Sequence, residues 1–591
     1  MPLRTHTCGE LRKVHIGQAV SLAGWVNNYR DHGGVIFIDL RDREGVTQLV
    51  FHPEAAQAHT LADKLRHEDV VQITGSVIER MDEQGKSLAN PKLSTGEIEV
   101  NASDLVILNK SQTPPFTPSD ASGVGEEIRL RYRYLDLRRP KMQQNLRTRH
   151  RVTKIMRDYF NENGFYEIET PFLCKSTPEG ARDYLVPSRL NAGHFYALPQ
   201  SPQIFKQILM VSGLERYVQI ARCFRDEDPR ADRQAEFTQL DMEMSFVEAD
   251  DVMAINEQMV RRIWQEVLGV EVPPVPRMNY HEAIRRYGSD RPDLRFGLEL
   301  VDVTDLTAQT DFKVFRGAID AGGIVKAICV PGGASLSRKQ TDALAQWVKQ
   351  FGLGGLPTTK VQDGDLSTGI AKFLEPISAA LIDRMAATNL DLLCFGVDAK
   401  PSVVDRALGE LRIKLAGDLD MIPADQWQWL WVVDFPLVEW DEQQKRWNSL
   451  HHPFTAPADE DRDRLESDPG SVKSKAYDLV LNGSELGGGS IRIHQPEVQR
   501  QVFSLLGINE QQAHQKFGFL LDALQFGAPP HGGIAFGLDR IVMHLCGTTN
   551  IRDVMAFPKT QTGADLMTEA PSPVDAGQLN ELHLRIAGGS K

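Results

Sequence analysis

The sharpest alternation of polar and apolar positions runs along Gln219–Phe246. Both ends of this stretch repeat every two residues, which is the period of a strand with one apolar and one polar face. The polar segment between them, Asp228–Ala235, contains a proline, so the stretch predicts an antiparallel hairpin with a longer loop. The polar positions of the two arms include Gln219, Arg225, Glu227, Gln239, Asp241 and Glu243. Such a face suits a phosphate, a metal ion or an amine, but it also fits a solvated surface of ion pairs.

The first 110 residues carry the pattern of a small barrel. Five short runs are rich in β-branched and apolar residues, and polar or glycine-containing segments separate them. The predicted strands are Ala19–Tyr29, Val35–Leu40, Val46–His52, Val70–Glu79 and Glu97–Leu108, with a helix at Ala55–His67. This order is typical of a five-stranded OB-fold barrel. There, Arg30, Phe37 and Gln48 would offer a cation, a ring and an amide to single-stranded bases, although Phe37 also fits a core position.

The pattern beyond residue 110 predicts further domains of mixed α+β type. Proline, serine, threonine and glycine gather at Ser111–Glu127, which marks a linker. The spacing of apolar residues predicts helices at 141–163, 250–268, 338–351 and 401–415 and a strand at 165–170, and residues 390–397 form an apolar run. Between about Phe296 and Ile422 the chain reads as an inserted α+β domain, and its residues suggest no chemistry.

A second group of polar residues follows Ser201. A serine followed by Pro202 is typical of a helix start, with the hydroxyl as N-cap and the proline at the first helical position. On that helix Gln203, Lys206 and Gln207 share one face. Two amides and an ammonium one turn apart would suit a small acidic molecule, and they would equally suit a surface stripe.

A third polar group lies between Leu450 and Arg540. Because adjacent side chains of a strand point to opposite faces, at most one of His451 and His452 is expected to address a ligand directly. A hairpin is predicted at 476–493 around Asn482-Gly483, and Asp478 and Glu485 on its two arms would together hold a hard divalent cation. Three consecutive glycines in the second arm indicate a close approach to the backbone. Arg540, at a glycine-lined junction of strand and helix, is well placed for a terminal phosphate.

Composition narrows the classes of function. The chain has 591 residues, enough for about three or four domains, and its formal net charge is −14. Bulk charge therefore gives no support to a nucleic-acid partner, and any such binding has to be local. From Arg129 to Lys154 ten basic residues face only Asp136, a local excess that fits a phosphate contact or a solvated helix face.

The cysteines and the apolar runs bear on location. The six cysteines show no paired spacing, which argues against a zinc site and a disulfide framework and fits a reducing compartment. No apolar run approaches the ~18 residues of a membrane span, and the first residues lack the apolar core of a signal peptide. We expect a cytoplasmic protein.

Taken together in this order, the three groups resemble the signature motifs of the class II aminoacyl-tRNA synthetases, and most closely the bacterial aspartyl type. The strings that carry the resemblance are TPEGARDYLVPSR, ALPQSP, FRDED, RADRQ, HHPFT, GGGSIRIH and FGLDR. The resemblance covers nearly the whole chain. It implies an α+β multidomain fold with an OB-fold barrel, an antiparallel-sheet catalytic domain and an inserted domain. The implied divisions are a barrel at 1–110, a hinge at 111–139, a catalytic domain at 140–295 and 423–560, an insertion at 296–422 and an extension at 561–591.

The resemblance also implies a role for each matching residue. The residues implied at the aspartate are Glu179, Ser201, Gln203, Lys206, Arg225, Asp241, His451 and Arg492. The residues implied at ATP are Arg225, Asp226, Glu227, Gln234, Glu485, Gly537, Leu538, Asp539 and Arg540. Arg225, Glu227 and Arg540 would carry the catalysis, Asp478 and Glu485 would hold Mg²⁺, and Arg30, Phe37 and Gln48 would read the anticodon. A homodimer is implied as well.

His32 matches a position where relatives that also charge tRNA(Asn) tend to carry histidine and strictly aspartate-specific ones carry leucine. The two anticodons differ in their last base, so a small change beside that base would relax discrimination. We therefore expect a ligase that attaches L-aspartate to tRNA(Asp) and to tRNA(Asn).

Three alternatives to this expectation stay open. An enzyme restricted to tRNA(Asp) differs only in its discrimination. An ATP-dependent ligase acting on free aspartate would need no anticodon barrel. A non-catalytic RNA-binding protein should have lost Arg225, Lys206, Arg492 or Arg540, and all four are present.

Overall fold

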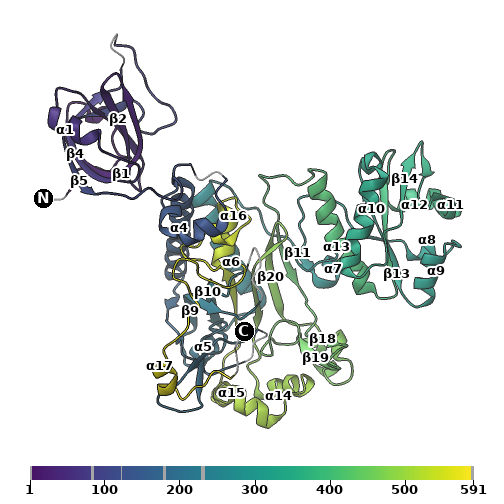
Figure 1. Ribbon diagram of the computed structural model, residues 1–591. Coiled ribbons are helices and arrows are strands. Elements are labelled where there is room, and N and C mark those ends of the chain that lie inside the picture. The colour runs from purple at the N-terminus through teal and green to yellow at the C-terminus, as the bar shows by residue number, and fades with distance from the viewer. Residues whose placement is uncertain (1–2, 82–84, 121–122, 178–180, 228–232, 588–591) are drawn as a thin grey trace. The chain divides into compact units, whose positions relative to one another are not determined.

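The computed structural model describes residues 3–81, 85–120, 123–177, 181–227 and 233–587 (Figure 1). The chain divides into two compact units. One unit consists of residues 1–148 and 552–573, and the other of residues 149–551 and 574–591. Among the residues described, no helix combines the length and the apolar character that crossing a bilayer requires.

The first unit contains the predicted five-stranded barrel, drawn in purple in Figure 1. It closes in the order β1-β2-β3-β5-β4, and the helix follows the third strand as expected. The bounds are β1 (Ala19–His32), β2 (Val35–Arg41), β3 (Val46–Phe51), α1 (Ala56–Ala62), β4 (Val70–Glu79) and β5 (Ile98–Asn109). Alternate residues such as Leu22, Ile38, Leu49 and Ile73 fill the interior. The OB-fold prediction is confirmed, and only the helix is shorter than expected.

The basic run after the linker is largely engaged within this unit. Two short helices, α2 (Glu126–Arg131) and α3 (Arg133–Asp136), precede the long helix α4 (Pro140–Glu162). Buried Arg133 donates to the carbonyl oxygens of Met555 and Ala556 at 2.7 and 2.9 Å. Arg138 pairs with Glu68 of the barrel at 2.7 Å and lies over the ring of Trp25. Arg138 therefore fastens the hinge to the barrel, and Arg133 fastens it to the segment at residues 555–556.

The second unit is built on an eight-stranded sheet with the order β11-β17-β20-β21-β22-β10-β9-β6. Only the two edge pairs, β11 with β17 and β6 with β9, are parallel. The strands are β6 (Tyr166–Glu167), β9 (Arg216–Phe224), β10 (Glu236–Ser245), β11 (Arg277–Asn279), β17 (Trp429–Val433), β20 (Ala476–Leu481), β21 (Ser484–Ile491) and β22 (His531–Gly537). The antiparallel sheet expected from the family resemblance is thus present.

Both predicted hairpins belong to this sheet. β9 and β10 pair antiparallel with Phe224 opposite Glu236, so the loop begins directly after the strand. In the β20–β21 turn, Asn482 and Gly483 have φ of 50° and 81°, the left-handed conformations that a type I′ turn requires. The predicted strand at 165–170 shrinks to two residues at the sheet edge. Its first residue, Phe165, instead closes the end of α4 by donating to the carbonyl of Phe160 at 3.0 Å.

Helices pack on both faces of the eight-stranded sheet. α5 (Gln203–Val211) contacts β9 and β10, α16 (Leu538–Leu545) contacts β10, and α6 (Ala249–Leu268) contacts β22. The other helices that lie outside the insertion are α7 (Tyr280–Tyr287), α14 (Pro496–Leu505), α15 (Glu510–Leu524) and α17 (Ala576–Glu581). Two small ribbons, β7 (Leu185–Pro187) with β8 (Phe195–Ala197) and β18 (Val438–Asp441) with β19 (Arg446–Ser449), complete this part.

Residues 301–418 form a separate five-stranded sheet with the order β12-β13-β16-β14-β15. Its strands are β12 (Val301–Asp302), β13 (Ile324–Val330), β14 (Thr358–Gln362), β15 (Asp365–Ser367) and β16 (Leu392–Asp398). Each face has its own apolar core, with α13 (Pro401–Asp418) and α10 (Arg338–Trp347) on one side and α9 (Lys313–Asp320) and α12 (Ser378–Arg384) on the other. Two short helices, α8 (Thr304–Thr307) and α11 (Ala371–Leu374), complete it.

Candidate active site

The predicted site residues of the second unit gather around two adjoining cavities. The larger has a volume of about 420 Å³ and is lined by Lys206, Asp241 and Arg492 among others. The smaller has a volume of about 190 Å³ and is lined by Gln234 and Arg540 among others. The residues that line both are Arg225, Glu227, Gln239, Glu485 and Ala535. One cleft therefore joins cationic side chains that come from α5, from the residue after β21 and from α16.

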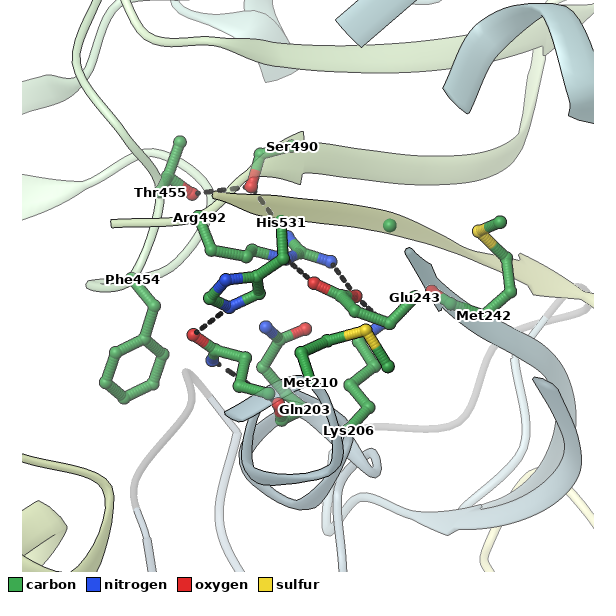
Figure 2. Close-up of polar contacts among 12 residues, drawn as sticks. Gln203, Lys206, Met210, Met242, Glu243, Phe454, Thr455, Ser490, Arg492 and His531 are labelled. Atoms are coloured by element: carbon green, nitrogen blue, oxygen red, sulfur yellow. Dashed lines mark hydrogen bonds and ion pairs between the residues drawn. The ribbon is translucent and has the colours of Figure 1, made fainter. Parts of the chain in front are cut away.

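The buried side chains of Lys206, Asp241, Glu243 and Arg492 form a continuous network of charges beside the larger cavity, at what we call the aminoacyl end. Figure 2 labels three of them, Lys206, Glu243 and Arg492. The Nζ of Lys206 lies 2.7 Å from Asp241 and 3.3 Å from Glu243. The guanidinium of Arg492 contacts the two oxygens of Glu243 at 2.9 and 3.1 Å. Lys206 and Arg492 are therefore held side by side by one carboxylate. Paired in this way, both cations can be buried.

The two carboxylates of this network lie on one face of β10, because side chains alternate between the faces of a strand. Asp241 and Glu243 are two residues apart, and both point toward the side chains of α5 and β21. Glu243 needs the glycine opposite it, because a Cβ on Gly533 would lie 2.1 Å from its Oε2. The three glycines of β21 have the same function, since a side chain there would meet Phe536, the Asp478 carboxylate or the Gly533 carbonyl.

Helix α5 turns its polar side inward rather than to solvent. Gln203, Lys206 and Gln207 are all buried, which excludes the surface-stripe alternative. The helix begins at Gln203, one residue later than predicted, and Pro202 stands at the N-cap position. The hydroxyl of Ser201 still accepts a hydrogen bond from the backbone N–H of Gln203 at 3.3 Å. The Nε2 of Gln203 is buried without a partner among the residues that the structure describes, so a ligand oxygen in the cavity would satisfy it.

Both histidines of the HHPFT string line the larger cavity, although they are held differently. His452 contacts Arg492 through Nε2 at 2.8 Å. The ring of His451 packs against Phe435 at 4.6 Å, and its buried Nε2 has no hydrogen-bond partner in the parts of the chain that are described. Burial and the charge of Arg492 lower the pKa of His451 to about 4, so this ring is neutral near pH 7. His451 is therefore the one free to address a ligand, as the sequence indicated.

The two carboxylates of β10 titrate in opposite directions. Burial raises the pKa of Asp241, and the nearby charge of Lys206 only partly offsets this rise. Burial acts on Glu243 too, but Arg492 and Lys206 together hold its pKa below the usual value. Glu243 is therefore the fixed anion of the network, whereas Oδ2 of Asp241 is buried and has no hydrogen-bond partner within the described part of the chain.

The smaller cavity forms the nucleotide end of the cleft. Arg225 lies over the ring of Phe237 at 5.0 Å, and Glu227 pairs with Arg233 at 3.1 Å. Arg540 donates to the backbone carbonyl of Glu485. A planar ring beside two arginines suits a nucleotide with its phosphates.

Three of the predicted ATP residues of this end are placed less directly. Asp539 accepts hydrogen bonds from Arg149 at 2.5 Å and from the backbone N–H of Thr238 at 2.8 Å, so its carboxylate fixes the start of α16. Leu538 is buried, and Asp226 pairs with Arg182 at 3.7 Å. Neither of the two is among the residues described as lining the cleft. Their assigned contacts with ATP stay predictions.

Asp478 and Glu485 lie on either side of Gly488. A Cβ on this glycine would be 2.7 Å from Oδ1 of Asp478 and 3.4 Å from Oε1 of Glu485. The Oδ1 of Asp478 is buried, and no described residue forms a hydrogen bond with it. Burial, with the charges of Glu485 and Asp290, raises the pKa of Asp478 well above its usual value. An orphaned carboxylate oxygen beside a second carboxylate fits a hard divalent cation such as Mg²⁺.

The predicted anticodon residues form a polar patch on the barrel. Arg30 contacts Asp39 at 2.9 Å and the side-chain oxygen of Gln48 at 3.0 Å. The amide of Gln48 donates to Glu99 at 2.7 Å. The ring of Phe37 is partly exposed rather than in the core, and it meets the exposed ring of His32 edge-on at 5.9 Å. The ring of Phe37 and the guanidinium of Arg30 are therefore partly exposed, whereas Gln48 is buried and both ends of its amide are engaged by Arg30 and Glu99.

Glu179 lies outside the described residues. The prediction that it contacts the aspartate therefore has no structural counterpart here.

Comparison with known proteins identifies the family. A model of class II tRNA synthetases (D, K and N) matches residues 125–561, and a model of the OB-fold nucleic acid binding domain matches residues 20–108. The chain belongs to the class II tRNA synthetases. The first match covers most of the chain and includes every described residue of the cleft.

Relatives of this synthetase match over almost their whole length. A protein of Desulfatibacillum aliphaticivorans is 56% identical, with 99% of this chain and 98% of the relative covered. One of Natranaerobius thermophilus is 54% identical, with 98% and 99% covered. Both are named aspartate–tRNA(Asp/Asn) ligase. An asparaginyl-tRNA synthetase of Pyrococcus horikoshii, solved with asparaginyl-adenylate, matches with a TM-score of 0.60 at 19% identity, over 94% of this chain and 98% of that one. That likeness shows the fold alone.

Three carboxylates of this synthetase received no role from its sequence. Glu243 shares the parity of Asp241, so the alternation of β10 could have singled it out, but its pairing with Arg492 joins strands far apart in the chain. In the barrel, Asp39 lies opposite Gln48 in the pairing of β2 with β3, and Glu99 lies on β5, which also pairs with β3. No local pattern marks them, because their function arises only from the pairing of strands.

Proposed function

We propose that this chain is an aspartate–tRNA ligase that activates L-aspartate with ATP and transfers the aspartyl group to tRNA(Asp) and tRNA(Asn). The observation that carries the proposal is the pair Lys206 and Arg492, fixed by Glu243 in a cleft that continues to Arg225 and Arg540. The names of relatives with more than half of their residues identical support the same activity and both tRNAs.

The aminoacyl end suits a dicarboxylic amino acid. Lys206 and Arg492 offer hydrogen bonds and positive charge to the side-chain carboxylate. The unpartnered Oδ2 of Asp241 is available to the ammonium group, and Glu179 would add a second carboxylate from its loop. Asparagine would present a neutral amide to two cations and lose the charge-assisted bonds. Ser201, Gln203 and His451 complete the polar wall around the substrate.

The chemistry needs no nucleophile from the protein. The α-carboxylate of aspartate attacks the α-phosphorus of ATP in line, a bond forms to the carboxylate oxygen, and pyrophosphate leaves. Arg225 lines both cavities, so it can neutralise the charge that develops on the α-phosphoryl oxygens. Arg540 and Glu227 hold the nucleotide at the other end. A terminal ribose hydroxyl of the tRNA then attacks the acyl carbon, and AMP leaves.

Asp478 and Glu485 are the proposed holders of Mg²⁺. When bound, the ion would neutralise phosphate charge. The protein's contribution is the pair of carboxylates set on either side of Gly488, whose missing side chain leaves the space between them open.

The barrel supports tRNA rather than free aspartate as the acceptor. Arg30, Phe37 and Gln48 offer stacking and hydrogen bonds to anticodon bases, and His32 lies beside Phe37. A histidine at that position would tolerate the last anticodon base of either tRNA. The homodimer, the cytoplasmic location, the domain boundaries and the assigned site roles also remain parts of this proposal.

The test is to charge transcripts of tRNA(Asp) and tRNA(Asn) with labelled aspartate. We expect both to be charged, and His32→Leu to reduce charging of tRNA(Asn) more than that of tRNA(Asp). Charging of tRNA(Asp) alone would sink the dual specificity. Adenylate formation with neither tRNA charged would favour a ligase acting on free aspartate.

A further inference from the structure

A third carboxylate faces the larger cavity beside Asp478 and Glu485. Asp290 follows α7, is exposed, and lines the same cavity as the other two. Its charge also acts on the neighbouring helix, because it contributes to the raised pKa of Tyr280 in α7, after the larger effect of burial. None of the roles inferred from the sequence involves this residue.

The backbone around Asp290 is held firmly from both sides. α7 ends at Gly288, whose φ is 67° and whose missing Cβ leaves room for the carbonyl of Asp405 on α13. Beyond Asp290, the buried guanidinium of Arg412 donates to the carbonyl of Asp293 at 2.9 Å, and Arg295 pairs with the Asp293 carboxylate at 2.6 Å. The wall position of Asp290 is therefore anchored on both sides rather than set by a free loop.

These three carboxylates lack the cations that balance the aminoacyl end. Neither Asp290 nor Asp478 nor Glu485 forms an ion pair with any residue that the structure describes. Asp478 is the decisive member, because it is only 8% exposed and its Oδ1 has no partner. A buried carboxylate oxygen aimed into an open cavity calls for a cation that the solvent supplies.

We propose that Asp290 is the third carboxylate of the divalent-cation subsite formed by Asp478 and Glu485, and that it positions water molecules on the cation. This inference rests on the proposed function and deepens it. Within the described residues, no three acidic, histidine or cysteine side chains have the spacing of direct metal ligands. Asp290 is therefore assigned a contact through water, which suits Mg²⁺ because that ion keeps several of its waters when bound by protein.

The segment that leads into the insertion would therefore contribute to cation binding in the reaction. Asp290 would accept hydrogen bonds from waters on the cation. It would thereby fix the positions of those waters around an ion that Asp478 and Glu485 hold directly. Removal of its charge should weaken cation binding about tenfold, the range found when outer carboxylates of a metal site are lost. Because the ion and the nucleotide bind together, the effect should appear as a higher demand for Mg²⁺ at saturating aspartate.

The test measures cation binding directly, without catalysis. Free Mn²⁺ is followed by its electron paramagnetic resonance signal, with the full-length protein and α,β-methylene-ATP present. We expect Asp290→Asn and Asp290→Ser to raise the Kd for Mn²⁺ about tenfold, and Asp290→Glu to stay within about threefold of wild type. The control is Asp425→Asn, which removes one exposed negative charge that does not line the cleft.

Each outcome decides the inference. An unchanged Kd for Mn²⁺ in both Asp290→Asn and Asp290→Ser overturns the inference, because the carboxylate would then contribute nothing to cation binding. An equal rise of the Kd in Asp425→Asn also overturns it, because the loss of a negative charge elsewhere on the protein would then explain the effect. Failure of the proposed function has a different signature, namely a wild-type protein that shows no aspartate-dependent exchange of pyrophosphate into ATP. The Mn²⁺ measurement does not depend on that exchange, so the two results are independent.

Discussion

The two ends of the cleft treat charge in opposite ways. At the aminoacyl end, Lys206, Glu243 and Arg492 each have a partner of opposite charge within 3.3 Å. At the cation subsite, Asp478 and Glu485 both lie close to Gly488, and no cationic side chain among the described residues pairs with either of them. The first end is organised before substrate arrives, whereas the second stores repulsion that a cation would relieve. One end provides specificity for the amino acid and the other provides affinity for a charged cosubstrate.

This difference follows from what each end has to bind. The side-chain carboxylate of aspartate brings one negative charge, and two cations held at a fixed spacing receive it. A buried carboxylate between these cations holds them in place and compensates the cost of burying them. Mg²⁺ and ATP arrive as charged species, so the site that receives them has to be incomplete. The sheet joins the ends through Arg225, which lines both cavities.

The largest effect should come from removing the side chain of Arg225, which lines both cavities. Arg225→Ala should lower aspartate-dependent ATP–pyrophosphate exchange by about 10³-fold, because a fixed donor to the developing phosphoryl charge is lost. The control is Arg222→Ala on the same strand, which pairs with Glu236 and does not line the cleft. Exchange that is equal in Arg225→Ala and wild type would show that the ends work independently.

The comparison itself predicts opposite changes in stability. Glu243→Gln should destabilise the folded protein by about 3 kcal/mol, since two buried cations lose their shared anion. Asp478→Asn should leave the Tm unchanged or raise it in the absence of Mg²⁺, because it removes an unpaired buried charge. Thermal unfolding followed by tryptophan fluorescence checks both. A loss of stability in both variants, equal in size, would refute the contrast.

The barrel offers a change that should leave both ends untouched. Phe37→Ala should weaken tRNA binding by about 1–3 kcal/mol, the usual contribution of a stacked base, while exchange measured without tRNA stays at the wild-type level. Filter binding of the tRNA transcript gives the affinity. If exchange fell in parallel with binding, the ring would serve the fold rather than the anticodon.

The smallest effect concerns pH. Burial, with the charge of Arg540, lowers the pKa of His544 in α16 to about 4, whereas the unfolded value is 6.5. The unfolded chain therefore takes up a proton first as the pH falls from 6.5 to 4, and stability is lost over that window. His544→Leu should flatten this loss in urea unfolding measured across the window. An unchanged slope would contradict the assignment of that proton.

The sequence reveals the parts of the cleft that depend on local pattern. The alternation of β10, the Asn482-Gly483 turn and the polar face of α5 were readable because each follows a short period or a local turn rule. The family strings then supplied roles for residues that are far apart in the chain.

What the sequence could not reveal depends on contacts between distant strands. Glu243 is one more acidic residue on a strand until β21 brings Arg492 beside it. Asp290 is a loop carboxylate until α7 and the segment anchored by Arg412 place it against the cavity. The strand predicted at 165–170 is longer than the observed β6, because the backbone N–H of Phe165 instead bonds to the carbonyl of Phe160 at the end of α4.

The most direct test of the account is the exchange of labelled pyrophosphate into ATP, measured without tRNA and with aspartate or asparagine as the amino acid. A cleft in which Lys206 and Arg492 read a side-chain carboxylate beside a bound nucleotide predicts exchange at least about 100-fold faster with aspartate, as expected for the loss of two charge-assisted hydrogen bonds. Equal exchange with asparagine, or none with aspartate, would contradict it.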